Sequence, residues 1–351
     1  MLIFRRSAIR SVFAVTAMTL SVAAAHAQEL QKNILTGGPT GTYIQFGKDI
    51  AGLMGQCGQT LNVNESAGSL ENFLGVRQRP NTQFGIVQSD VLEYLQTYSA
   101  DDPAIARAIN GVKIAFPLYN EEVHILAKKE IESLADLTGR RVAVGVEDSG
   151  TFLTSSLILD LADVALEEAL TIGPDDSFAQ LRSGEIDAFF YVAGAPTSLF
   201  SNADIDPEEF HLLPISDPVL QSVYTPTQIP AGTYDFQPDD LTAVAVKAIL
   251  MTFEYNPNRN SYHRASCKAV ADVANQVFTR FPELQADGHP KWQQVDLTDI
   301  PPGWDISACV NEGLAPTYTL SCAGDASVNG TPTESEANAA YRARICAQIG
   351  C

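Results

Sequence analysis

The stretch from residue 33 to residue 47, NILTGGPTGTYIQFG, constrains the fold of this chain more than any other. Its first residues are apolar and end a strand, and the glycines and proline of residues 37–41 form a turn that no helix or strand interior tolerates. From Tyr43 onward, apolar residues such as Ile50 and Met54 recur at helical spacing. The first amides of a helix lack internal partners and lie at the positive end of its dipole, so the stretch predicts an anion site. Taken alone, it fits an ordinary strand-to-helix turn at least as well.

The N-terminal residues have the pattern of a secretory signal peptide. Three arginines precede an apolar run over residues 11–25, and Ala25-His26-Ala27 matches the small-x-small rule for cleavage. We expect residues 1–27 to be removed near Ala27, leaving a soluble periplasmic protein without a stable membrane anchor. A membrane-spanning helix is the alternative, but the run is short and polar residues follow it.

Charge narrows the classes of ligand. The formal net charge is −20 at pH 7, which argues against nucleic acid and against anionic membrane surfaces as partners. A small anion is still compatible with this charge, because local amides can hold it.

The cysteines predict disulfides. An even number in an exported chain favours bridges, and neither metal-type C-x-x-C spacing nor a histidine cluster occurs, so we expect no metal and no cofactor. Their pairing stays open, with local bridging of the C-terminal tail as the favoured arrangement. The disulfide candidates are Cys57, Cys267, Cys309, Cys322, Cys346 and Cys351.

Alternating strands and helices predict an α/β fold in two lobes. The chain is expected to build the first lobe over residues 28–120 and the second over 121–215. It then returns to the first lobe over 216–305 and ends in a disulfide-stapled, loop-rich tail over 306–351. Two crossings between lobes make a hinge, and a ligand would lie between the lobes, where polar turns follow the strands.

Several motifs occur in a characteristic order. They are TGGPTGTY (36–43), ESAGSLEN (65–72), FGIVQSDV (84–91), PLYNEEVHILAK (117–128), LADLTGRRVAVGVEDSGT (134–151) and GEIDAFFYVAGAP (184–196). Over residues 33–255 the chain resembles the TAXI branch of the solute-binding proteins of TRAP transporters. The cysteine-bearing tail and the residues Glu65 and Ala67 depart from that pattern.

The resemblance implies a type II-like periplasmic-binding-protein fold that closes on a small organic anion, such as glutamate, glutamine or 2-oxoglutarate. It implies delivery of that anion to a TRAP membrane permease driven by an ion gradient. We expect a monomeric receptor rather than an enzyme.

The candidate ligand-binding residues lie in the polar turns and in the second-lobe motifs. They are Gly38, Thr40, Gly41, Tyr43, Ser66, Gly68, Ser69, Asn72, Gln88, Ser89, Asp90, His124, Ser149, Gly150, Thr151, Gly194 and Pro196. Helix capping is the alternative role for the serines and for Asp90, and a structural role is the alternative for His124.

Charged residues near the turns are few. Glu65 or Asp90, if it faced the cleft, would accept an ammonium group and favour an amino acid over a keto acid. No arginine stands inside a glycine turn, so amides and hydroxyls are expected to hold the anion, with Arg182 left open.

Two other functions are alternatives to a transport receptor. A ligand-sensing or interaction protein on the same fold would explain the unusual tail. A hydrolase or transferase would need Ser149 or Ser69 with His124 and Asp90, but the chain has no G-x-S-x-G and no H-E-x-x-H motif.

Overall fold

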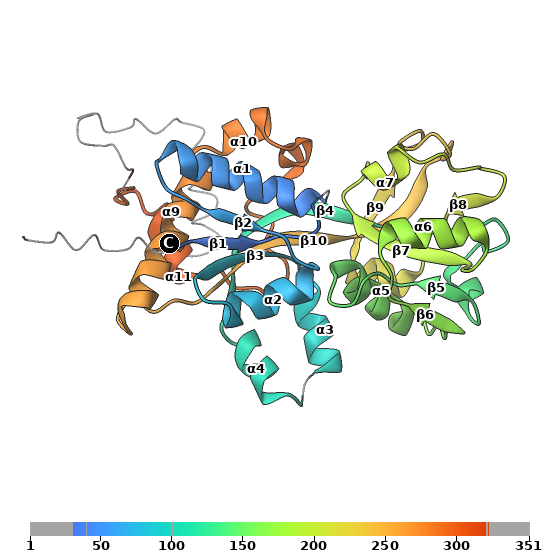
Figure 1. Ribbon diagram of the computed structural model, residues 1–351, viewed down its shortest axis with the longest axis horizontal. Helices are drawn as coiled ribbons and strands as arrows, with labels where there is room; N and C mark the ends of the chain where they lie inside the picture. Colours follow the sequence, from blue (N-terminus) through green and yellow to red (C-terminus); the bar gives the residue numbers. More distant parts are fainter. Residues whose placement is uncertain (1–30, 40, 100, 321, 323–351) are drawn as a thin grey trace, which may run out of the picture.

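The computed structural model describes residues 31–39, 41–99, 101–320 and 322. Two lobes lie side by side, joined by a pair of long strands (Figure 1). The described strands form one ten-stranded sheet in the order β2-β1-β3-β10-β4-β7-β5-β6, with β8 on β4 and β9 on β10. The α/β architecture with two lobes and a hinge, expected from the sequence, is confirmed.

The first lobe combines the N-terminal part of the chain with its C-terminal helices. Its short strands are β1 (Asn33–Leu35), β2 (Asn62–Asn64) and β3 (Thr82–Gln88), with β1 parallel to both of the others. Its helices are α1 (Thr42–Gln56), α2 (Ser69–Gln78), α3 (Val91–Tyr98), α4 (Pro103–Ile109), α9 (Ser261–Thr279), α10 (Phe281–Asp287), η2 (Pro290–Gln294) and α11 (Ala308–Leu314). Helices α1 and α2 lie on opposite faces of the sheet (Figure 1).

Two long antiparallel strands form the hinge. Strand β4 (Val112–Lys128) pairs with β10 (Leu241–Phe253), and both run from one lobe into the other (Figure 1). From the sequence alone, residues 112–119 and 122–127 predict two separate strands. They are continuous because the ladder absorbs Pro117, which lacks an amide, at a register shift between Lys247 and Ile249.

Strand β10 could be read from the sequence as either a strand or a helix, because its apolar residues do not alternate with polar ones. In the first lobe, Ala248 and Leu250 join the core on one face of the sheet. Ile249 and Met251 join the core on the other face. A strand buried on both faces has no period-two pattern, which explains the ambiguity.

The second lobe packs its own strands and helices around the far halves of β4 and β10. Its strands are β5 (Arg141–Ala143), β6 (Glu168–Leu170), β7 (Ala188–Ala193), β8 (Phe210–Leu212) and β9 (Thr225–Ile229). Its helices are η1 (Leu134–Leu137), α5 (Gly150–Leu161), α6 (Pro174–Ser183), α7 (Ser198–Ser201) and α8 (Pro218–Val223).

The chain leaves the second lobe later than expected. Tyr234 and Phe236 share a core with Phe189 and Phe200, and β9 pairs with the first residues of β10. The return to the first lobe therefore occurs along β10 rather than at residue 216, because a proline-rich stretch still supplies apolar side chains to the second core.

The C-terminal residues that the structure describes are not a locally stapled appendage. Helix α11 packs its Cys309, Val310 and Leu314 side chains into the first-lobe core. Cys309 pairs with Cys267 of α9, and Cys322 pairs with Cys57 at the end of α1. The expectation of local bridging is thus wrong for these two cysteines.

Several expectations fall outside the described residues. These are the signal peptide at residues 1–27, Thr40, Cys346 and Cys351. Within the described part of the chain, no helix has the length and apolar character needed to cross a membrane.

Candidate functional site

A cavity of about 330 Å³ lies between the two lobes. From the first lobe and β4 it is lined by Gly37, Gly38, Gly41, Thr42, Tyr43, Ser66, Ala67, Gly68, Gln88 and Glu121. From the second lobe it is lined by Gly145, Val146, Ser149, Gly150, Thr151, Ile172, Pro174, Ser177, Phe190, Tyr191, Val192 and Ala193. All four of the polar turns expected from the sequence, at residues 37–42, 65–69, 88–90 and 149–151, thus contribute residues to one cavity.

Two helices begin at this cavity. The cap residue of α1, Gly41, offers no side-chain hydrogen bond, and the first turn of α1 carries no acid. Helix α5 begins after Ser149, whose Oγ accepts a hydrogen bond from the Phe152 amide at 3.1 Å, and its first turn also lacks an acid. No negative side chain in either first turn therefore offsets the positive ends of these dipoles, and both favour an anion.

Glycine is required where the lobes meet. Gly68 has a φ of +130°, and a Cβ on it would lie 3.3 Å from the Gly150 amide nitrogen. A Cβ on Gly150 would lie 2.3 Å from Gln88 Oε1. The Leu70 amide donates to the Asp148 carbonyl at 3.1 Å across the same junction. Side chains at either glycine would hold the lobes apart.

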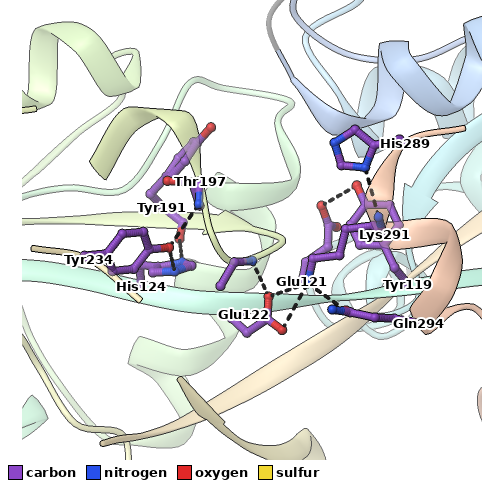
Figure 2. A network of polar contacts seen from close by, with 11 residues as sticks. Tyr119, Glu121, Glu122, His124, Tyr191, Thr197, Tyr234, His289, Lys291 and Gln294 are labelled. Carbon is purple, nitrogen blue, oxygen red and sulfur yellow. Dashed lines mark hydrogen bonds and ion pairs between the residues drawn. The ribbon is translucent and has the colours of Figure 1, made fainter. Parts of the chain in front are cut away.

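Glu121 lies at the cavity wall and was not predicted. Its Oε2 accepts a hydrogen bond from the Tyr43 hydroxyl at 2.7 Å. Its Oε1 accepts one from the Tyr119 hydroxyl at 3.4 Å (Figure 2). The side chain is only 4% exposed, and burial raises its pKa to about 8 against the opposing effect of these hydrogen bonds. The one signal in the sequence was an acidic pair inside the apolar motif PLYNEEVHILAK.

The neighbouring Glu122 links the lobes instead of facing this cavity. Its Oε2 accepts from the Ala195 amide at 2.6 Å and from Lys291 Nζ at 3.3 Å (Figure 2). Gly194 and Pro196, both expected at the site, line an adjoining cavity of about 280 Å³ together with Lys291. The two cavities share residues of the α1 turn and of β7.

Ser69 and Asn72 support the turns rather than line the cavity. Ser69 Oγ accepts from the Gln88 amide at 3.0 Å. Asn72 Nδ2 donates to the carbonyls of Thr36 at 2.5 Å and Ile86 at 2.7 Å. Both side chains are fully buried, so their polar groups satisfy backbone atoms of the turns.

His124 is a buried structural residue. Its Nδ1 lies 3.2 Å from the Tyr191 carbonyl, and its Nε2 lies 2.8 Å from the Tyr234 hydroxyl (Figure 2). A carbonyl only accepts, so Nδ1 carries the proton and Nε2 accepts from Tyr234, whose oxygen accepts from the Thr197 amide. Burial lowers the pKa of His124 to about 4 and keeps it neutral behind Tyr191.

Ser89 and Asp90 line a different cavity, of about 650 Å³, which shares no lining residue with the first. Asp90 Oδ2 accepts from the Thr154 hydroxyl at 2.9 Å and from the Tyr224 hydroxyl at 3.3 Å, both in the second lobe. Desolvation raises the pKa of Asp90 to about 7. Asp90 therefore bridges the lobes and does not contact the first cavity.

The remaining charged candidates also lie elsewhere. Glu65 is exposed and does not line the cavity, and Arg182 lies over the Phe178 ring. Among the described residues that line the first cavity, none is arginine, lysine or histidine. The described part of the chain also contains no cluster of His, Cys, Asp and Glu able to hold a metal ion.

Comparison with known proteins places the chain in a family. A model of the NMT1-like family matches residues 34–263. The chain is also similar to solved structures, among them the protein Tv2483 bound to L-arginine. That match has 12% identity and a TM-score of 0.47, and covers 77% of this chain and 93% of that one.

Two further matches are a TctC solute-binding protein from Polaromonas and the periplasmic binding protein BugD. The first has 12% identity and a TM-score of 0.40, and covers 72% of this chain and 88% of that one. The second has 9% identity and a TM-score of 0.44, and covers 76% and 85%. The two-lobed α/β fold expected from the sequence is present in the structure, and the chain belongs to the NMT1-like family.

Proposed function

We propose that this protein is a periplasmic solute-binding receptor of the TAXI type. It captures a small organic anion and delivers it to a TRAP-type permease driven by an ion gradient. The observation that supports this proposal is the cavity between the lobes, where α1 and α5 both begin and where neither first turn carries an acid. Two helix N-termini at one cavity favour negative charge between them.

The cavity suits a small carboxylate. Its volume of about 330 Å³ lies at the lower end of the range for small-molecule sites. The polar residues Ser66, Ser149 and Thr151 line it beside the starts of the two helices. Glutamate, glutamine and 2-oxoglutarate are the ligands that we take as starting points.

The hinge provides a way to close on the ligand. Among the described strands, only the antiparallel pair β4 and β10 carries the sheet from one lobe to the other. The lobes also touch through Gly68 and Gly150, next to the cavity. A ligand that bridges the two helix starts would favour the arrangement in which these glycines meet.

A thermal-shift screen of the purified mature protein tests the proposal. We expect C4–C6 dicarboxylates or amino acids to raise the unfolding temperature in a dose-dependent way. Gly38→Trp should abolish that rise, because a Cβ on Gly38 has no neighbour within 4 Å and the ring can enter the cavity that Gly38 lines. Gly52→Trp adds the same ring at an unobstructed position of α1 outside the cavity and should keep the response.

Failure of every small carboxylate and amino acid to stabilise the protein would contradict the receptor proposal. The transport step has its own test. Cells that carry the receptor with its candidate permease should take up the identified ligand, and cells whose receptor carries Gly38→Trp should not. Uptake that does not depend on the receptor would contradict the permease partnership.

A further inference from the structure

The cavity between the lobes contains charge of one sign only. Glu121 is the single ionisable carboxyl group among its described lining residues, and no lysine, arginine or histidine accompanies it there. The first turns of α1 and α5 supply the positive ends of two helix dipoles at the same cavity. The cavity therefore has an acidic point and an amide-rich edge, which is the pattern of a site for a zwitterion.

Glu121 is arranged to receive a donor from the ligand. Tyr43 and Tyr119 each donate to one of its oxygens. A side-chain hydrogen bond with Gln88 also favours the ionised form of Glu121. A carboxylate has about four lone-pair sites, so these three hydrogen bonds leave room for one further donor. The side chain lies at the cavity wall, and a ligand ammonium entering there would meet a carboxylate that no protein cation neutralises from within the cavity.

We propose that the ligand is a zwitterionic α-amino acid with an uncharged side chain, whose ammonium group binds Glu121 and whose carboxylate binds the amides at the starts of α1 and α5. This inference rests on the proposed receptor function and names its substrate class. A keto acid has no ammonium group to bind ionised Glu121. A second carboxylate, as in glutamate, would find no cation among the described lining residues.

The uptake or release of protons on binding distinguishes an amino-acid ligand from a carboxylate ligand that has no ammonium group. The ionisable groups near Glu121 are Tyr43 on α1, Tyr119 and Glu122 on β4, and Tyr191 on β7. On η2, Lys291 pairs with Glu122 and lies over the Tyr119 ring, outside the cavity. Burial raises the pKa of each of these tyrosines, so they stay neutral near pH 8. The pKa of Glu121 is about 8 in the free protein, and a bound ammonium favours its ionised form.

The affinities for an amino acid and for a keto acid should change with pH in opposite directions. An amino acid needs ionised Glu121, so its affinity should rise between pH 6 and pH 8 and binding at pH 7 should release protons. A keto acid would need protonated Glu121 as a donor, and its affinity should fall over the same range. Titration calorimetry in two buffers of different ionisation enthalpy measures both quantities.

The closing experiment compares matched ligands and matched variants. The ligand pairs are glutamate with 2-oxoglutarate, alanine with pyruvate, and leucine with 4-methyl-2-oxopentanoate, and the other amino acids, including glutamine, complete the panel. We expect an uncharged amino acid to bind, its 2-oxo counterpart to fail, and glutamine to bind more tightly than glutamate. Glu121→Gln should weaken the amino acid by about 10- to 100-fold.

Glu65→Gln is the matched control, since it removes the same charge from an exposed position outside the cavity and should change the affinity less than twofold. The unfolding temperature without ligand shows whether either variant is folded. Binding of keto acids without amino acids, or of glutamate above glutamine, would overturn this inference and leave the receptor proposal standing. Binding of neither class would overturn both.

Discussion

Glu121 and Asp90 are both buried carboxyl groups beside a cavity where the lobes meet, yet they are held in opposite ways. Glu121 accepts hydrogen bonds from Tyr43 and Tyr119, which lie on α1 and on its own strand β4. Asp90 lies in the first lobe and accepts from Thr154 and Tyr224 of the second. One carboxyl group is thus satisfied without contact across the lobe junction, and the other only while the lobes stay together.

This difference in hydrogen-bond partners suits Glu121 to binding the ligand and Asp90 to holding the lobes closed. Because the partners of Glu121 lie on the first-lobe side, it keeps its hydrogen bonds when the lobes move apart and faces the ligand in either state. Asp90 would lose both partners on opening, and its Oδ1 already lacks a hydrogen-bond partner among the described residues. Desolvation raises the pKa of both groups, to about 8 and about 7, so both titrate near neutral pH.

The largest effect is expected when both donors to Asp90 are removed. Thr154→Val combined with Tyr224→Phe leaves the buried carboxyl group without a partner, and the Thr154 change also removes the 3.1 Å hydrogen bond to Gln88. The free energy of unfolding should fall by about 2–4 kcal/mol. Urea denaturation of the ligand-free protein measures it.

Two comparisons test that interpretation. Tyr98→Phe removes a hydroxyl that also reaches across the lobes, to Asp160, but this side chain is 44% exposed. Tyr98→Phe should lower the free energy of unfolding by no more than about 0.5 kcal/mol. Adding Asp90→Leu to the double variant should recover most of the loss, since an apolar group needs no donor. A double variant as stable as the parent would show that Asp90 does not hold the lobes together.

The second largest effect is expected at Gly150. Gly150→Ala places a Cβ 2.3 Å from Gln88 Oε1 and 2.8 Å from Ser69 Oγ, which forces the lobes or these side chains to shift. Ligand affinity, measured by calorimetry with the amino acid found in the screen, should fall about tenfold. Gly52→Ala in α1 meets nothing within 4 Å and should leave affinity unchanged while raising stability by about 0.5–1 kcal/mol. Equal affinities of the two variants would contradict a closed junction at Gly150.

Local signals made the turns predictable. Glycines beside Ser66 and Ser149 mark turns in the sequence alone, and they line the cavity in the structure. The alternation of strands and helices likewise predicted the two lobes. Capping roles were foreseen, and Ser149 does cap α5 while lining the cavity.

The parts that were missed depend on distant pairs. Tyr43 and Glu121 are 78 residues apart, and Cys57 and Cys322 are 265 residues apart. An acid inside an apolar strand does not show which face of the sheet it occupies. Asp90 was also expected at the ligand site, because a polar residue just after a strand predicts a cleft position. The turn directs Asp90 to the neighbouring cavity.

A smaller effect is expected from pH alone. Each of the two acids has its pKa raised by folding, so each contributes stability that is complete below its unfolded pKa near 4 and is lost as pH rises through the folded value. Between pH 6.5 and pH 8.5 the unfolding temperature of the ligand-free protein should therefore fall. Asp90→Asn should flatten the lower part of that fall and Glu121→Gln the upper part. A temperature that rises with pH in both variants and in the parent would contradict the buried, protonated state of these groups.

The smallest effect is expected on the pH midpoint of ligand affinity, and it tests whether Glu121 titrates independently of Asp90. Tyr43→Phe removes the 2.7 Å hydrogen bond that favours ionised Glu121, so the pKa of Glu121 rises further. The midpoint of the pH dependence of amino-acid affinity should move to higher pH, as measured by calorimetry between pH 6 and pH 9. Tyr191→Phe removes a cavity hydroxyl without a hydrogen bond to Glu121, and Tyr224→Phe removes a donor to Asp90. If Glu121 alone receives the ligand and Asp90 serves closure, neither of these two variants shifts the midpoint, because neither changes the stability of the Glu121 carboxylate. A shift with Tyr224→Phe equal to that with Tyr43→Phe would show that the two carboxyl groups titrate as one coupled unit.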